Sequence, residues 1–116
     1  MFTEIPDEDW APIQPCLTHR IVQKNRVLMK PGEICTHLYF LEMGSIRYFI
    51  NEGKEVSTVH TNHPPGIISS HESFIQQTPS LFGIQSIEES YVWIITRVDF
   101  YRLMEIQSWK DFISKI

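Results

Sequence analysis

The chain has 116 residues and a formal net charge of −4, and 42% of its residues are hydrophobic, which indicates one globular domain with a real core. Nucleic-acid binding needs a basic surface, so the acidic balance excludes DNA or RNA as a partner of this chain alone. No apolar run reaches the roughly 18 residues of a membrane span, and residues 1–7 form no secretory signal, which favours a cytoplasmic protein without a membrane partner.

The first quarter of the chain predicts one short helix and two strands. Acidic residues at positions 7–9 precede Trp10, Ile13 and Leu17, whose spacing is that of one helix face. From residue 18 to residue 30 the pattern changes to strand, and Asn25 lies at the expected turn.

The centre of the chain predicts three more strands punctuated by glycines. Residues 38–43 and 45–51 are rich in aromatic and β-branched side chains, and Gly44 lies where the chain must turn between them. Gly53 suits a position with positive φ in the next hairpin, which leads into a strand over residues 54–61.

The following segment predicts a short helix between short strands. Pro64 and Pro65 cannot continue a central strand, so the chain breaks there before a new element begins at Ile67. Residues 69–77 predict a short helix or a tight loop, and residues 84–87 and 91–96 predict strands.

The end of the chain predicts two helices, because residues 96–99 and 108–111 both fit a capping box. The second helix carries large apolar residues at i, i+3, i+4 and i+7, which are Trp109, Phe112, Ile113 and Ile116. We expect these four residues to form a homodimer interface. Trp109 is the one expected to fold back onto the chain's own strands, whereas Phe112 and Ile116 should face a second subunit.

Many short strands at regular spacing favour a mainly β fold of the jelly-roll type, with a short N-terminal helix and two C-terminal helices. The most distinctive residues are Pro31-Gly32-Glu33, Leu38-Tyr39-Phe40-Leu41, Gly44, Arg47 and Gly53-Lys54-Glu55. This set resembles the front half of a Crp/Fnr-type cyclic-nucleotide-binding domain, and the resemblance extends from about Trp10 to the end of the chain. It implies a double-stranded β-helix jelly roll with the helices outside the barrel.

The resemblance also implies a function, that of the ligand-sensing domain of a transcription regulator. Residues 1–116 would then be a single sensor domain that ends within the C-terminal dimerisation helix. No helix-turn-helix is expected in this chain, so DNA contact would require a further C-terminal domain. No cofactor is expected.

In the family that this chain resembles, the ligand lies in a cassette between the sixth and seventh strands, where a Gly-Glu pair and an arginine hold it. The matching segment here is residues 66–87, and it departs from that pattern. Ser70-His71 replace the Gly-Glu pair, Glu72 lies near the glutamate position, and Ser80 or Leu81 replaces the arginine. No Arg or Lys occurs between Lys54 and Arg97, so we expect a degenerate cassette that does not bind cyclic AMP in the usual way.

A small polar or anionic ligand remains the expected partner of this segment. The candidate binding residues are Ser69, Ser70, His71, Glu72, Ser73, Phe74, Ser80, Leu81 and Phe82. The serines supply hydroxyls, Glu72 supplies a carboxylate, and the two phenylalanines would wall the pocket. The alternative is that Ser69 and Ser70 only cap a short helix and that Phe74 belongs to the core.

Two other functions are compatible with a jelly roll. A cupin-like metal-dependent enzyme would use His37, His60, His63 and His71 with Glu72, but a spacing of three residues does not place His60 and His63 on one strand face. We therefore expect exposed histidines, no metal site and no catalytic residues. A ligand-free scaffold for protein contacts is the third possibility. Arg47 is expected on the outer face of its strand.

Overall fold

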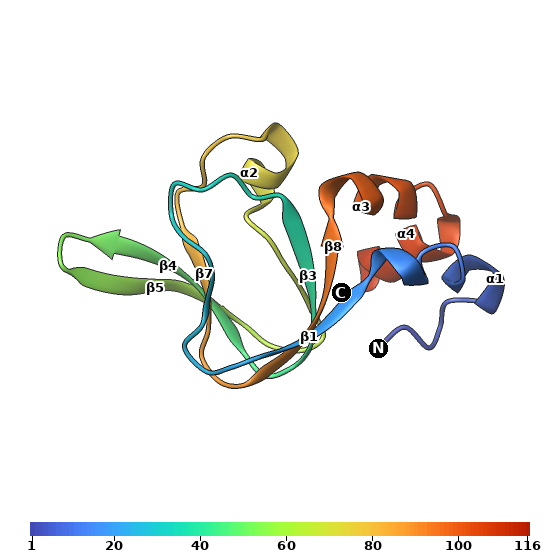
Figure 1. Cartoon of the computed structure of the whole chain (residues 1–116), viewed down its shortest axis with the longest axis horizontal. Coiled ribbons are helices and arrows are strands. Elements are labelled where there is room, and N and C mark those ends of the chain that lie inside the picture. Colours follow the sequence, from blue (N-terminus) through green and yellow to red (C-terminus); the bar gives the residue numbers. More distant parts are fainter.

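The computed structural model describes residues 1–116 and consists of eight strands with four α-helices and one 3₁₀ turn (Figure 1). The strands are β1 (Thr18–Val22), β2 (Val27–Met29), β3 (His37–Met43), β4 (Ile46–Glu52), β5 (Glu55–Asn62), β6 (Gly66–Ile68), β7 (Gly83–Ser86) and β8 (Ser90–Thr96). The helices are α1 (Asp7–Trp10), α2 (His71–Gln76), α3 (Arg97–Leu103) and α4 (Gln107–Lys115), and the 3₁₀ turn is Gln14–Cys16.

The strands form two four-stranded antiparallel sheets, in the orders β1-β8-β3-β6 and β2-β7-β4-β5. The mainly β jelly roll with a short N-terminal helix and two C-terminal helices is therefore confirmed. No helix is both long and apolar enough to cross a membrane.

The glycines mark the turns as the sequence predicts. Gly44 has φ +98°, and a Cβ at this position would collide with the backbone and hydroxyl of Ser90, so the turn between β3 and β4 needs glycine. The β4–β5 hairpin extends past the rest of its sheet (Figure 1), because β7 pairs with β4 only from Ile46 to Phe49.

Helices α1, α3 and α4 lie outside the barrel against the β1-β8-β3-β6 sheet (Figure 1), and aromatic side chains join them to it. Phe2 contacts Trp10, Phe40, Trp109 and Phe112 with ring centroids 5.3–5.5 Å apart. Trp109 is fully buried, and its indole N–H donates to the Asp9 carbonyl at 3.0 Å.

The structure corrects two expectations about the C-terminal helices. Phe112 is only 5% exposed and packs against Phe2 and Phe40 in the chain's own core, so it does not face outward toward a second subunit. Thr96 caps α3 as predicted, since its side chain accepts from the Asp99 amide. The same role for Ser108 is wrong, because α4 already begins at Gln107 with Ile106 at its N-cap position, and the Ser108 hydroxyl donates to the Asp9 carboxylate at 2.7 Å.

The aromatic cluster predicts a large cost for truncating its central residue. Trp109→Ala should lower the free energy of unfolding by about 3–5 kcal/mol, because it opens a cavity and leaves the Asp9 carbonyl without its donor. Urea denaturation measures this change. Val98→Ala, at an exposed position of α3, is the control, and its free energy of unfolding should stay within about 0.5 kcal/mol of wild type. A loss below about 1 kcal/mol for the Trp109 variant would show that α4 does not depend on this cluster.

Candidate ligand-binding site

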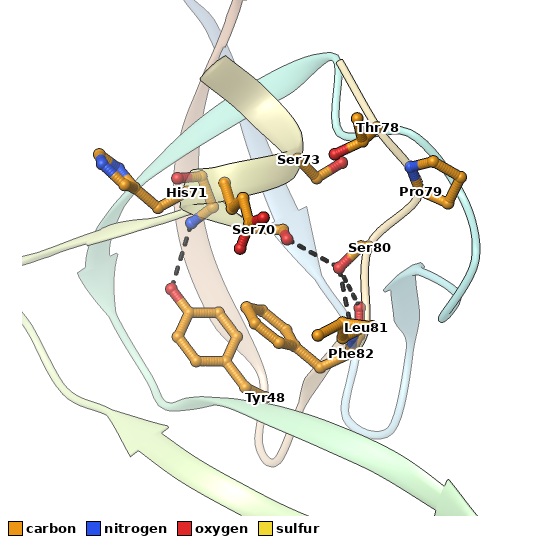
Figure 2. Close-up of a pocket in the computed structure, with 11 residues that line it drawn as sticks. Tyr48, Ser70, His71, Ser73, Thr78, Pro79, Ser80, Leu81 and Phe82 are labelled. Atoms are coloured by element: carbon orange, nitrogen blue, oxygen red, sulfur yellow. Dashed lines mark hydrogen bonds between the residues drawn. The ribbon is translucent and has the colours of Figure 1, made fainter. Parts of the chain in front are cut away.

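A pocket of about 380 Å³ lies beside α2, between that helix, the segment that leads into β7, and the inner face of β4 (Figure 2). Its lining consists of Tyr48, Ser69, Ser70, His71, Glu72, Ser73, Thr78, Pro79, Ser80, Leu81 and Phe82. Eight of the nine predicted ligand residues are therefore gathered around one hollow. That they bind a ligand stays a prediction.

The two walls of the pocket are joined by serine hydroxyls. Ser70 and Ser80 are both buried, and their oxygens share a hydrogen bond of 2.7 Å (Figure 2). Ser80 also donates to the Phe82 carbonyl at 2.7 Å and accepts from the Phe82 amide at 3.2 Å. Because a buried hydroxyl without a partner is costly, these bonds fix the spacing between the start of α2 and the opposite wall.

Helix α2 is held at its other side by three further side chains. The Ser73 hydroxyl accepts from the Cys35 amide at 2.8 Å, and the Gln77 side-chain amide donates to the carbonyls of Cys35 and Phe74, both at 2.9 Å. Arg97 donates to the carbonyls of Phe74 and Ile75 at 2.8 and 3.1 Å. The bonds to Phe74 and Ile75 satisfy carbonyls near the end of the short helix, and the bonds to Cys35 tie the helix to the segment before β3.

An aromatic pair forms the floor of the pocket. The ring centroids of Tyr48 and Phe82 lie 4.8 Å apart, and the Tyr48 hydroxyl accepts a hydrogen bond from the Ser69 amide at 3.2 Å (Figure 2). Burial raises the pKa of the Tyr48 phenol, so the group is neutral at physiological pH. Sequence analysis missed Tyr48 as a pocket residue. It could have been predicted, because alternate residues of a strand face opposite sides. With Arg47 on the outer face, its neighbour Tyr48 must point inward.

The pocket contains no Lys or Arg, and Glu72 carries its only carboxylate. His71 is exposed, and its ring points away from the hollow (Figure 2). Arg47, the nearest cation along β4, is held elsewhere: it donates to the Gln85 side chain at 3.0 and 2.7 Å and to Thr58 at 2.9 Å. The prediction that Arg47 lies on the outer face is consistent with these partners. The site therefore offers hydroxyls and backbone groups but no positive charge.

Two candidate residues differ from the rest. Phe74 does not line this pocket; it is 3% exposed and packs against Phe100 and Tyr101, as the core alternative expected. Leu81 lies at the rim and is 84% exposed.

The helix-cap alternative fails for Ser70, which occupies the N-cap position of α2 but makes no capping hydrogen bond with its side chain.

The histidines of the enzyme alternative lie apart. His60 stacks on Tyr48 with ring centroids 6.3 Å apart, and His37 shares a hydrogen bond with Thr36. No three His, Cys, Asp or Glu side chains in the chain come together in a way that could hold a metal ion. No observation favours a metal-dependent reaction here.

Residues 19–107 match the family model of the cyclic nucleotide-binding domain, so the chain belongs to that family of regulatory binding domains. Solved structures agree on the fold. The catabolite activator protein of Thermus thermophilus matches with a TM-score of 0.72 at 16% identity, covering 90% of this chain and 49% of that one. This chain thus spans about half the length of the Thermus protein.

Two further structures are similar. A cyclic nucleotide-binding-like protein from Brucella abortus has a TM-score of 0.70 and 23% identity, with 90% of both chains covered. A CooA variant from Carboxydothermus hydrogenoformans has a TM-score of 0.75 and 14% identity, covering 95% of this chain and 70% of that one.

The serine bridge predicts an energetic coupling between the pocket walls. Ser70→Ala and Ser80→Ala should each lower the free energy of unfolding by about 1–3 kcal/mol, because each leaves a buried hydroxyl short of a partner. The loss of unfolding free energy in the double variant should be smaller than the sum of the two single losses by about 0.5–1.5 kcal/mol. Urea denaturation of all four proteins measures the cycle. Ser70→Ala combined with Ser57→Ala on the distant hairpin is the control and should be additive; an equally additive Ser70–Ser80 cycle would contradict the bridge.

Proposed function

We propose that this chain is the ligand-sensing domain of a Crp/Fnr-like transcription regulator and that its cassette pocket takes a small, uncharged polar molecule rather than cyclic AMP. The observation that carries this proposal is a cassette pocket lined by hydroxyls and an aromatic floor, without a cation. Family membership supports the regulatory role.

The missing cation argues against a cyclic phosphate on physical grounds. A phosphate monoanion that leaves water needs charged or strongly polarised donors to replace its hydration. Here a phosphate would meet amides and hydroxyls only, and Glu72 would add repulsion. Losing a guanidinium partner costs about 2–4 kcal/mol, which weakens binding tens- to hundreds-fold.

The same lining suits a neutral ligand with a planar part. Tyr48 and Phe82, whose rings are tilted by 44° to each other, offer apolar ring faces, and Ser69 and Thr78 line the same pocket with polar groups. A planar ring can stack on the aromatic floor, and its hydroxyl or amide groups can exchange hydrogen bonds with the serines. A ligand-free scaffold would have no need of such a hollow, and no observation favours that role.

The remaining parts of the proposal concern the whole protein. Residues 1–116 form one sensor domain, and α4 belongs to the dimerisation helix. A separate DNA-binding domain would make the contact with DNA, and the protein would act in the cytoplasm as a homodimer.

The charge argument predicts how two matched probes should bind. Cyclic AMP should bind no tighter than about 10 μM, close to −7 kcal/mol, and adenosine should bind at least as well because it leaves no unpaired phosphate. Calorimetric titration gives both affinities. Chemical-shift changes at Tyr48 and Phe82 then show whether the cassette pocket is the site.

Phe82→Ala should abolish the adenosine response, and the exposed Val59→Ala variant should retain it. Cyclic AMP binding about tenfold tighter than adenosine, with shifts centred on Tyr48 and Phe82, would overturn the proposal. An identical result for the Phe82 and Val59 variants would remove the cassette pocket from it.

The homodimer proposal now rests on the two residues of the α4 stripe that keep some exposed surface, although both also pack against the core. Ile113 and Ile116 are half-buried, whereas Trp109 and Phe112 are core residues. Ile116→Asp should therefore weaken self-association at least about tenfold, since a large apolar side chain contributes roughly 1.5–3 kcal/mol when buried. Sedimentation equilibrium at high micromolar concentration measures it. Val98→Asp makes a comparable change on α3 and should have little effect; a monomeric wild type would exclude this interface.

A further inference from the structure

A second cavity, of about 310 Å³, opens at the edge of the barrel where β1 and β2 meet. Its lining consists of Arg20, Ile21, Val22, Gln23, Arg26, Leu28, Tyr39 and Ile94. It lies between strands of both sheets and shares no residue with the cassette pocket. Its chemistry is the reverse of that pocket, since two guanidinium groups and no carboxylate line it.

The arginines of this cavity are free to bind. Neither Arg20 nor Arg26 takes part in any of the ion pairs of the chain, and neither guanidinium donates a hydrogen bond to a protein atom. This contrasts with Arg47 and Arg97, whose guanidinium groups are bonded to side chains and carbonyls. Tyr39, whose hydroxyl has no hydrogen-bond partner in the protein, also lines the cavity.

The surrounding segment is strongly basic although the whole chain is acidic. Four of the ten Lys and Arg residues fall between positions 20 and 30, and residues 10–32 contain no Asp or Glu. Glu33, whose charge acts on Tyr39, lies in an adjoining hollow and accepts a hydrogen bond from the Lys30 amide. Within the cavity lining itself, the only charged side chains are those of Arg20 and Arg26.

The turn that carries Arg26 is rigid. Ser86, which is 1% exposed, accepts from the Arg26 amide at 2.9 Å and donates from its hydroxyl to the Gln23 carbonyl at 2.5 Å. Its backbone accepts from the Asn25 amide and donates to the Arg26 carbonyl, both at 3.0 Å. Because β7 fixes the turn at four points, the backbone at Arg26 does not have to be ordered when a ligand binds.

From this geometry we propose that the β1–β2 cavity is a binding site for a small anion bearing phosphate or carboxylate groups, held by Arg20 and Arg26. Guanidinium groups match the planar oxygen pairs of both anions and can bond them in bidentate fashion. Leu28 and Ile94 supply apolar walls that limit the access of water to these bonds. The anion-binding capacity of this domain thus lies away from its cassette.

Titration with inorganic pyrophosphate, followed by amide chemical shifts, tests the proposal, and succinate serves as the carboxylate arm. At least one of the two should produce saturable shifts centred on residues 20–26 and Tyr39. Arg20→Gln/Arg26→Gln should weaken that binding about tenfold or more, because charge-assisted bonds are lost at both positions. Lys54→Gln/Lys110→Gln removes the same charge elsewhere and should change affinity less than about threefold.

Both arginines are exposed and unpaired, so their substitution should leave the fold intact, and the spectrum of each variant verifies this. Tyr39→Phe removes a single oxygen and gives an independent arm; a several-fold weaker affinity would support the site. Equal effects of the two double variants would overturn it. So would shifts that rise linearly with both probes, since these indicate general attraction to a basic surface. The cassette pocket is tested separately with the uncharged probe adenosine. A failure of either test therefore leaves the other proposal standing.

Discussion

The hydrogen bond between Ser70 and Ser80 is the constraint on which the cassette depends. These two positions face each other across the pocket, and both residues are almost fully buried. In a low-dielectric site a charge at either position would need an opposite charge or several donors, whereas a hydroxyl pair satisfies itself. The hollow is therefore preserved without a ligand and without a buried ion, which leaves the cassette geometry intact while its electrostatics differ from a phosphate site.

The arginines of the chain all lie outside this pocket. Arg47 and Arg97 are used structurally, the first across β4, β5 and β7 and the second at the end of α2. Only the β1–β2 edge retains arginines without partners beside a cavity. Two hollows of opposite character thus exist in one small domain, one lined by hydroxyls and one by two arginines.

The sequence was sufficient for the strands and insufficient for the contacts between distant segments. Glycines and prolines mark most turns because few other residues tolerate those backbone angles, so the order of elements could be predicted. The apolar stripe on α4 could be predicted from the sequence, but the spacing of its residues does not tell which segment packs against it. Phe2, which has no neighbouring pattern, turns out to be its partner and places Phe112 in the core. Tyr48 was missed because its hydrogen-bond partner, the Ser69 amide, is distant in the sequence and comes close only in the folded chain.

The overhang of the β4–β5 hairpin has a consequence for local stability. Residues 50–52 and 55–57 bond only to each other, and an isolated two-stranded ribbon is marginally stable in water. Amide hydrogens at this tip should therefore exchange through local opening, well before those of β3 and β8 in the middle of their sheet. Tyr48 lies on the half of β4 that pairs on both sides. The tip of the hairpin can fray while the floor of the cassette pocket stays in place.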